Sequence, residues 1–228
     1  DAQESRGLGD VYKRQTWNYE VGSHLTLWEG RLLADLSAFY MDTRNQQIAK
    51  FAENGLGRIT VNAGKSHSYG AEASLRAALT TAFTVNASYG YTYATFKEYA
   101  TNTKIDGETQ PVDYNGNYVP FVPKHTLSLG GQYIFRINPG HWLDRIQLNA
   151  NYTGAGRIYW TEQNDVSQAF YGTLNGRLSL QKGNGQIDFW VRNALDKDYA
   201  AFYFESMGNG FMQKGRPIQA GIELRCRF

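Results

Sequence analysis

Hydrophobic and polar residues alternate along most of the chain, most clearly in its last eleven residues. Ile218, Ala220, Ile222, Leu224, Cys226 and Phe228 share one parity, whereas Gln219, Gly221, Glu223, Arg225 and Arg227 share the other. Successive side chains of a β-strand point to opposite faces, so this segment is predicted to be a strand with one apolar and one charged face. An antiparallel strand of a soluble β-sandwich also alternates, so this strand alone leaves both architectures open.

The same alternation predicts nine strands after residue 16, and no segment shows a convincing helical period. They are expected at Trp17–Leu27, Arg31–Asp42, Ile59–Leu79, Phe83–Glu98, Phe121–Arg136, Arg145–Tyr159, Phe170–Lys182, Gln186–Tyr199 and Ile218–Phe228. Most of them are clearly longer than the roughly 5–6 residues typical of strands in globular sheets. Two residues break the pattern, because Trp190 and Ile134 lie on polar parities.

The links between these strands are alternately short and long. Brief turns are expected near Trp28, Thr80, Pro139 and Gly183, and longer loops over Thr43–Arg58, Tyr99–Tyr118, Thr161–Gln168 and Ala200–Gly215. Short turns at one end and long loops at the other are typical of outer-membrane barrels. Aromatic residues also gather at the strand ends, where their rings suit a membrane–water boundary. We therefore predict an all-β fold, an antiparallel up-and-down transmembrane β-barrel segment of about nine strands.

Composition narrows the choice further. The chain has 228 residues and a net charge of +2, which gives no reason to expect nucleic acid as a partner. A mean hydropathy of -0.52 and the lack of an apolar run near 18 residues exclude a transmembrane helix bundle. A barrel is still allowed, because its strands need an apolar residue only at every second position.

Catalytic, metal and cofactor chemistry finds little support in the sequence. Cys226 is the single cysteine, and its parity makes it a small hydrophobic residue of the apolar face. The four histidines, His24, His67, His125 and His141, lack the close partners of a metal site. No hydrolase, phosphate-loop or metalloprotease motif occurs. We expect neither an enzyme nor a resident cofactor.

The beginning of the chain differs from the rest. Residues 1–15 show no alternation and no charged start followed by an apolar core, as a signal peptide would have. We expect them to be a scar or a disordered segment, and an exported barrel to have a leader that is missing here. The fold is accordingly assigned to residues 16–228.

Six short stretches along the chain combine glycine, asparagine, proline and aromatic residues in recognisable motifs. They are Tyr19-Glu20-Val21-Gly22, Asn62-Ala63-Gly64-Lys65, Ser68-Tyr69-Gly70-Ala71-Glu72, Val119-Pro120-Phe121-Val122-Pro123-Lys124-His125, Asn193-Ala194-Leu195-Asp196-Lys197-Asp198-Tyr199 and Gly215-Arg216-Pro217. In this order and spacing they resemble the barrel domain of TonB-dependent outer-membrane receptors. Ala194-Leu195 stands where Leu-Phe is usual, and Ile218 stands where the family has Arg. Asn193 and Asp196 are expected to bond their own backbone where the strand ends.

The resemblance implies a receptor that binds a scarce nutrient, such as a ferric siderophore, a cobalamin or a glycan. Its barrel has about 22 strands, so nine strands imply the C-terminal part of a larger barrel without its plug domain. The implied partners are outer-membrane lipid, the barrel-assembly machinery, the nutrient, and TonB through the missing N-terminal region. The implied location is the bacterial outer membrane, which the barrel crosses many times.

Ligand contacts are expected in the long loops, whose rings offer surfaces for stacking. The candidates are Tyr99, Tyr114, Tyr118, Phe202, Tyr203 and Phe204, for which mutual packing or contact with the membrane boundary is an equally good interpretation. By resemblance, Ile222, Leu224, Cys226 and Phe228 form the C-terminal assembly signal. A passive porin-like channel and a soluble carbohydrate-binding β-sandwich remain the alternative functions.

Overall fold

The computed structural model describes residues 14–51, 58–62, 64–105, 108–137, 139–206 and 208–227. These residues form seventeen β-strands, of which nine make one antiparallel sheet and eight pair as two-stranded hairpins. Among them there is no helix of the length and apolar character needed to cross a membrane. Residues 1–13 and Phe228 lie outside the described residues. The first strand begins at Gln15, the last residue of the segment predicted to be a scar.

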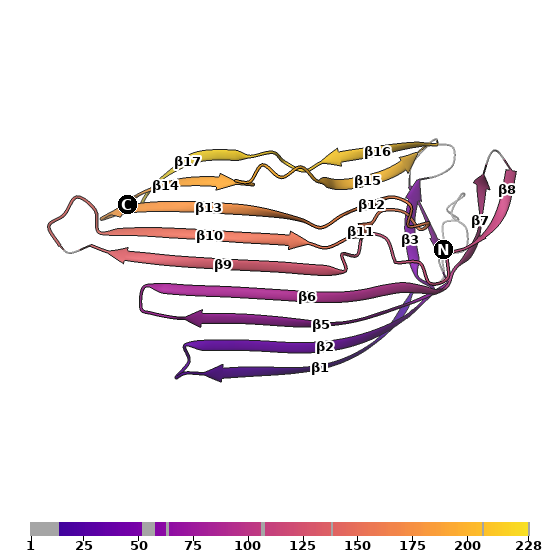
Figure 1. Cartoon of the computed structure of the whole chain (residues 1–228), viewed down its shortest axis with the longest axis horizontal. Helices are drawn as coiled ribbons and strands as arrows, with labels where there is room; N and C mark the ends of the chain where they lie inside the picture. The colour runs from indigo at the N-terminus through magenta and orange to yellow at the C-terminus, as the bar shows by residue number, and fades with distance from the viewer. Residues whose placement is uncertain are drawn as a thin grey trace, which may run out of the picture.

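The nine strands of the large sheet follow one another in an up-and-down order. Their bounds are β1 Gln15–Leu27, β2 Leu32–Arg44, β5 Lys65–Ala78, β6 Phe83–Glu98, β9 His125–Arg136, β10 Arg145–Ala155, β13 Tyr171–Lys182, β14 Gly185–Arg192 and β17 Gln219–Cys226. Each inner strand pairs with the preceding and the following strand of this series. The outermost strands are β1, which pairs with β2, and β17, which pairs with β14 (Figure 1). This order confirms the predicted fold class and the predicted number of strands in the sheet.

Four hairpins extend the sheet at one end. They consist of β3 Gln47–Phe51 with β4 Arg58–Asn62, β7 Ala100–Ile105 with β8 Glu108–Asp113, β11 Ile158–Tyr159 with β12 Ser167–Gln168, and β15 Ala200–Ser206 with β16 Asn209–Lys214. All four lie at the right of Figure 1, whereas the short turns lie at the left. The predicted long loops therefore share one end of the sheet, which we call the hairpin end, and the opposite end is the turn end.

The register gives the sheet an apolar face and a polar face. Ile146, Leu180, Ile187 and Leu224 are cross-strand neighbours in one row of β10, β13, β14 and β17. The adjacent row, Gln147, Ser179, Asp188 and Glu223, points to the other side. Ile222 and Leu224 are 66% and 75% exposed, so the described chain leaves the apolar face uncovered.

An aromatic row crosses the apolar face near the hairpin end. Tyr19, Tyr40, Tyr69 and Tyr93 are successive cross-strand partners in β1, β2, β5 and β6. The Tyr69 and Tyr93 rings stack at 5.1 Å, and Tyr118 continues the row by meeting Tyr93 edge-on at 5.4 Å. Tyr159 closes the row by stacking on Tyr118 at 5.1 Å. This arrangement confirms the predicted gathering of rings at the strand ends on the side of the long loops.

Three predicted strands have other bounds than the alternation suggests. The segment Ile59–Leu79 divides into β4 and β5, with Gly64 at a positive φ of 58° between them. Phe121 has φ 67° and precedes Pro123, so β9 begins only at His125. The strand predicted over Gln186–Tyr199 ends at Arg192, because Asn193 adopts φ 47°. A left-handed residue turns the chain out of the strand in each case.

Candidate functional site

The polar face is lined mainly by hydroxyl and amide side chains in its central strands. Serine, threonine, asparagine and glutamine occupy most of the positions on this face of β6, β9, β10 and β13: Thr84, Asn86, Ser88, Thr126, Ser128, Gln132, Gln147, Asn149, Asn151, Thr153, Thr173, Asn175, Ser179 and Gln181. Some bond across strands, as Thr153 and Thr173 do with Oγ1 atoms 3.1 Å apart. Such a wall offers neutral donors and acceptors to water or to a polar molecule.

A network of charged side chains lies on the polar face of β13, β14 and β17. Arg177 Nη1 donates to Asp188 Oδ2 and to Glu223 Oε2, both at 3.1 Å. Arg225 Nη2 donates to Glu223 Oε1 at 2.8 Å, and Gln186 Nε2 donates to Asp188 Oδ1 at 2.8 Å. Asp188 has no exposed surface, so these donors satisfy a fully buried carboxylate. The network joins the last three strands of the sheet.

Trp190 lies on the polar face, as its parity predicts. Its ring covers Gly221, where an added Cβ would lie 2.5 Å from Trp190 Cζ2. The Arg192 guanidinium lies 5.1 Å from the centre of the same ring, a cation–π arrangement. Gly221 therefore provides the space that lets a large ring lie flat on a wall of smaller side chains.

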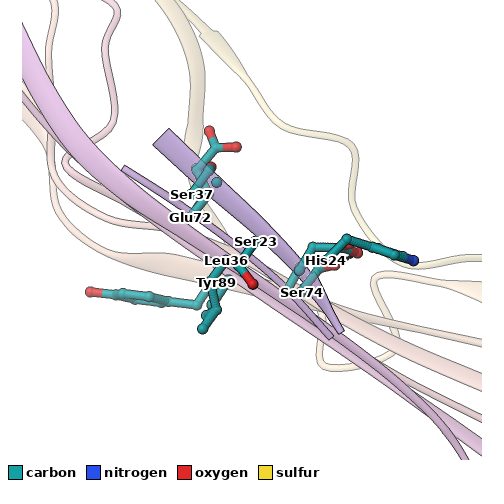
Figure 2. A pocket seen from close by; sticks show the side chains of 13 residues that line it. Ser23, His24, Leu36, Ser37, Glu72, Ser74 and Tyr89 are labelled. Atoms are coloured by element: carbon teal, nitrogen blue, oxygen red, sulfur yellow. Dashed lines mark hydrogen bonds and ion pairs between the residues drawn. The ribbon is translucent and has the colours of Figure 1, made fainter. Parts of the chain in front are cut away.

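A hollow of about 590 Å³ lies over strands β1, β2, β5 and β6. Glu72 lines it from the polar face, and the other residues of its cross-strand row are small: Gly22, Ser37, Gly90 and Thr126. Figure 2 shows Glu72 and Ser37 on one side of the strands and Tyr89 on the other. At its edge His24 bonds Asp35, which also accepts a hydrogen bond from Ser74 Oγ at 2.9 Å.

The hairpin end carries a cluster of aromatic rings beyond the sheet. Phe121 stacks on Phe202 at 5.7 Å and meets Trp160 edge-on at 5.6 Å. Phe202 continues to Phe204 at 5.9 Å, and Phe204 stacks on Phe211 at 5.1 Å. We call these five rings the hairpin ring cluster. Phe121 is 46% exposed and keeps its positive φ, a strained conformation for a bulky residue.

The six predicted ligand residues fall into three different surroundings. Tyr99 and Tyr114 are buried, at 2% and 5% exposure, in a small core with Phe96. Burial, followed by the nearby Glu162 carboxylate, raises the pKa of the Tyr99 hydroxyl. Tyr118 lies in the aromatic row. Phe202 and Phe204 belong to the hairpin ring cluster, and Tyr203 beside them donates to Glu205 at 3.0 Å.

Three amide side chains hold the loops of the hairpin end together. Asn164 accepts a hydrogen bond from the Tyr118 backbone N–H at 2.6 Å and donates to the Tyr118 carbonyl at 3.0 Å. Asn117 Nδ2 donates to the Glu162 carbonyl at 2.9 Å, and Gln168 Oε1 accepts from the Ala200 N–H at 2.7 Å. We call these contacts the amide seam. Nothing in the periodicity of the sequence indicates them, because they depend on loops meeting in space.

Asn193 forms a second junction, at the end of β14. Its amide group donates to the carbonyls of Lys197 at 3.1 Å and Arg216 at 3.0 Å, and accepts from the Lys197 N–H at 2.9 Å. Asp196 Oδ1 accepts from the Ile218 N–H at 2.9 Å. The predicted local bond is thus confirmed for Asn193, whereas Asp196 bonds the segment that leads into β17.

Possible metal ligands and the predicted assembly residues are the remaining groups of interest. Within the described ranges, no cluster of three or more histidine, cysteine, aspartate or glutamate side chains is arranged to hold a metal ion. Ile222, Leu224 and Cys226 share the apolar face of β17, and Cys226 is an exposed free thiol. Phe228, the fourth residue of the predicted assembly signal, lies outside the described residues.

Comparison with known proteins identifies relatives of this arrangement. A family model described as "TonB dependent receptor-like, beta-barrel" matches residues 14–194. The ferrichrome outer membrane transporter/phage receptor of Escherichia coli K12 is 28% identical over 195 residues, covering 83% of this chain and 24% of its own length. The metal-pseudopaline receptor CntO of Pseudomonas aeruginosa is 28% identical over 235 residues, covering 100% of this chain and 28% of its own length.

A solved structure shows the same fold. The ferric yersiniabactin uptake receptor FyuA of Yersinia pestis superimposes with a TM-score of 0.75 at 20% sequence identity, covering 94% of this chain and 30% of that one. The chain thus spans less than a third of the length of these relatives. The nine-stranded sheet corresponds to a segment of a larger barrel.

Proposed function

Because this chain belongs to the TonB dependent receptor-like β-barrel family, we propose that it forms part of the wall of an active nutrient receptor. The family match over residues 14–194 carries the proposal, and it places the chain in the bacterial outer membrane. The two faces of the sheet support it. The apolar face, with its aromatic row, suits lipid and the membrane boundary, and the polar face suits a lumen.

The proposed substrate class is a metal chelate of the siderophore type. The relatives named above are a ferrichrome transporter, a metal-pseudopaline receptor and a ferric yersiniabactin uptake receptor. We assign uptake to the complete receptor, with TonB supplying the energy through a region outside this chain. The family consists of receptors and transporters rather than enzymes. Cobalamin and glycans are the other nutrient classes whose uptake should be compared with that of the metal chelates.

The hairpin ring cluster, together with the neighbouring Tyr203, is the proposed ligand-contacting surface. Phe202, Tyr203 and Phe204 are half-buried, and Phe121 beside them is exposed. Such rings can stack on the organic part of a chelate. Tyr99 and Tyr114 are assigned a supporting role, because their burial leaves little surface for a ligand. Tyr118 is assigned to the membrane boundary on account of its place in the aromatic row.

Replacing Phe202 by Ala should weaken binding of the preferred ferric chelate to the complete receptor by about fivefold, the equivalent of one stacked ring pair. Titration of the receptor in detergent with a panel of hydroxamate, catecholate and mixed ferric siderophores measures this. Trp142→Ala is the matched control, because this 77% exposed ring lies at the turn end. Equal loss in both variants would contradict the assignment of the surface.

Uptake of radiolabelled iron in cells tests the function itself. The proposal expects uptake of the bound chelate to stop when TonB is deleted. Uptake that continues without TonB would favour the passive porin-like channel. A protein recovered in the soluble fraction would favour the carbohydrate-binding β-sandwich.

Deleting Phe228 in the same cells tests the proposed signal to the assembly machinery. The deletion should lower the amount of receptor in the outer membrane.

A further inference from the structure

Four arginines lie close together on the polar face at the turn end of the sheet. Arg136, Arg145, Gln181, Gln186 and Arg225 are successive cross-strand neighbours in β9, β10, β13, β14 and β17. Arg227 lies just beyond Arg225, and its backbone N–H donates to the Asn184 carbonyl at 3.0 Å. We call the four arginines and the two glutamines between them the arginine row. Their shared parity places them on the wall of the lumen, away from lipid.

Acidic groups neutralise only part of this charge. Arg225 is paired with Glu223 at 2.8 Å. Among the described residues, Arg136, Arg145 and Arg227 form no ion pair. Asp144 lies next to Arg145 in the chain but has the opposite parity, and it pairs with Lys182 at 2.8 Å. The polar face at this end therefore has an excess of positive charge.

The placement of these arginines also carries an energetic cost. Arg136 and Arg145 are directly opposite each other, and like charges in that position destabilise a strand pair. Beside them lies a hollow of about 180 Å³, lined by Arg145, Gln181, Gln186, Arg225 and Arg227 and by the turn residues between β13 and β14. Guanidinium groups bind carboxylates with two parallel hydrogen bonds, and the glutamine amides add further donors.

We propose that the arginine row binds an acidic polypeptide segment that enters the lumen from the turn end. A bound carboxylate would offset the repulsion between the opposed arginines and fill the hollow. A polypeptide suits the row better than a single small anion, because the arginines without an ion pair are spread over β9, β10 and the residue that follows β17. The inference rests on the proposed function in one respect, the assignment of the polar face to the lumen.

Site-specific photo-crosslinking in the complete receptor tests the proposal. A photoreactive benzoylphenylalanine replaces Gln181 in the middle of the row, and irradiated cells yield products whose captured peptides are sequenced by mass spectrometry. We expect a captured segment in which Asp and Glu outnumber Lys and Arg. Capture of a neutral or basic segment, or of no polypeptide, would overturn the inference. Capture of lipid would overturn the assignment of the polar face as well.

Charge variants identify the interaction. Arg145→Gln with Arg227→Gln should lower the crosslink yield by about fivefold, because two exposed ion pairs are lost. Arg192→Gln is the matched control, since it removes an arginine from the same face at the hairpin end and should leave the yield unchanged. Exchanging Arg145 for Glu and the captured carboxylate for Lys should restore the yield.

A second measurement keeps all the arginines and so does not depend on how well the variants fold. In isolated membranes, raising the salt concentration should reduce the crosslink yield at position 181, because exposed ion pairs are screened. A yield that salt leaves unchanged would contradict binding through charge.

Discussion

Glycines of the sheet differ sharply in the space above their Cα atoms. Gly221 lies beneath the Trp190 ring on the polar face, with the closest ring atom 2.5 Å from an added Cβ. Gly131 in β9 meets only Phe83 Cε2, at an ordinary 3.8 Å. Both lie within a strand, Gly221 in β17 and Gly131 in β9, and neither has a positive φ. The pair therefore separates the effect of packing from that of strand propensity.

Gly221→Ala should destabilise the folded receptor by about 1–3 kcal/mol, since the new methyl group pushes Trp190 from its place against Arg192. Gly131→Ala should have a small effect. Denaturant unfolding of the receptor in lipid vesicles, followed by tryptophan fluorescence, measures both changes. A similar loss of stability in the two variants would show that Trp190 moves aside without cost.

At the scale of elements, β17 presents the apolar and the polar face at adjacent positions. Ile222 pairs across the sheet with Phe189 on the apolar face, whereas Glu223 pairs with Asp188 on the polar face. Ile222→Arg should cost about 2–4 kcal/mol near the bilayer midplane. Glu223→Gln should cost less, because it weakens ion pairs that are exposed to solvent. Equal sensitivity of the two positions in an unfolding assay would count against a membrane-spanning strand.

The turns that precede β10 and follow β13 are joined by a carboxylate. Asp144 accepts hydrogen bonds from Lys182 Nζ at 2.8 Å and from the Gly183 N–H at 2.7 Å. The Lys182 contact first, and the Gly183 N–H second, lower the pKa of the Asp144 carboxyl below its usual value. A lowered pKa means that the contact stabilises the fold above about pH 4 and stops doing so as the carboxylate is protonated below that pH.

Asp144→Asn should therefore lower the melting temperature of the receptor at neutral pH, and the difference from the parent should close as the pH falls below about 4. Thermal unfolding at a series of pH values checks this. A difference that stays constant down to low pH would show that the turns are held by contacts other than this charge.

The sequence predicts the strands of the large sheet well, because the alternation of side chains is a local property. It predicts β6 at its observed bounds and the polar side of Trp190 from parity alone. The strand ends at Gly64, Phe121 and Asn193 are less predictable, since each depends on a left-handed backbone while the alternation of side chains continues past it. Phe121, Trp160 and Asn164 enter the candidate site through contacts between loops far apart in sequence, so periodicity gives no sign of them.

At the scale of the whole molecule, the described sheet has two open edges. β1 pairs only with β2, and β17 pairs only with β14, among the described strands. Both edges expose unpaired backbone groups, and the apolar face between them is broad. Exposed edges and apolar patches of this kind promote association between chains.

We predict that residues 17–228 on their own do not form a water-soluble monomer. Sedimentation of the purified segment without detergent should show aggregates. A stable monomer under these conditions would contradict the barrel interpretation and favour the soluble sandwich.

The amide seam has a consequence for how such receptors can diversify. Asn164 presents its side-chain amide to Tyr118 as a neighbouring strand would present its backbone, and the Gln168 side chain accepts a hydrogen bond from the Ala200 N–H. If only one loop were exchanged between relatives, these backbone groups would lose the side-chain amides that bond them. Recombination should therefore transfer the three loops together. A new specificity is then inherited with the hydrogen bonds that join its loops.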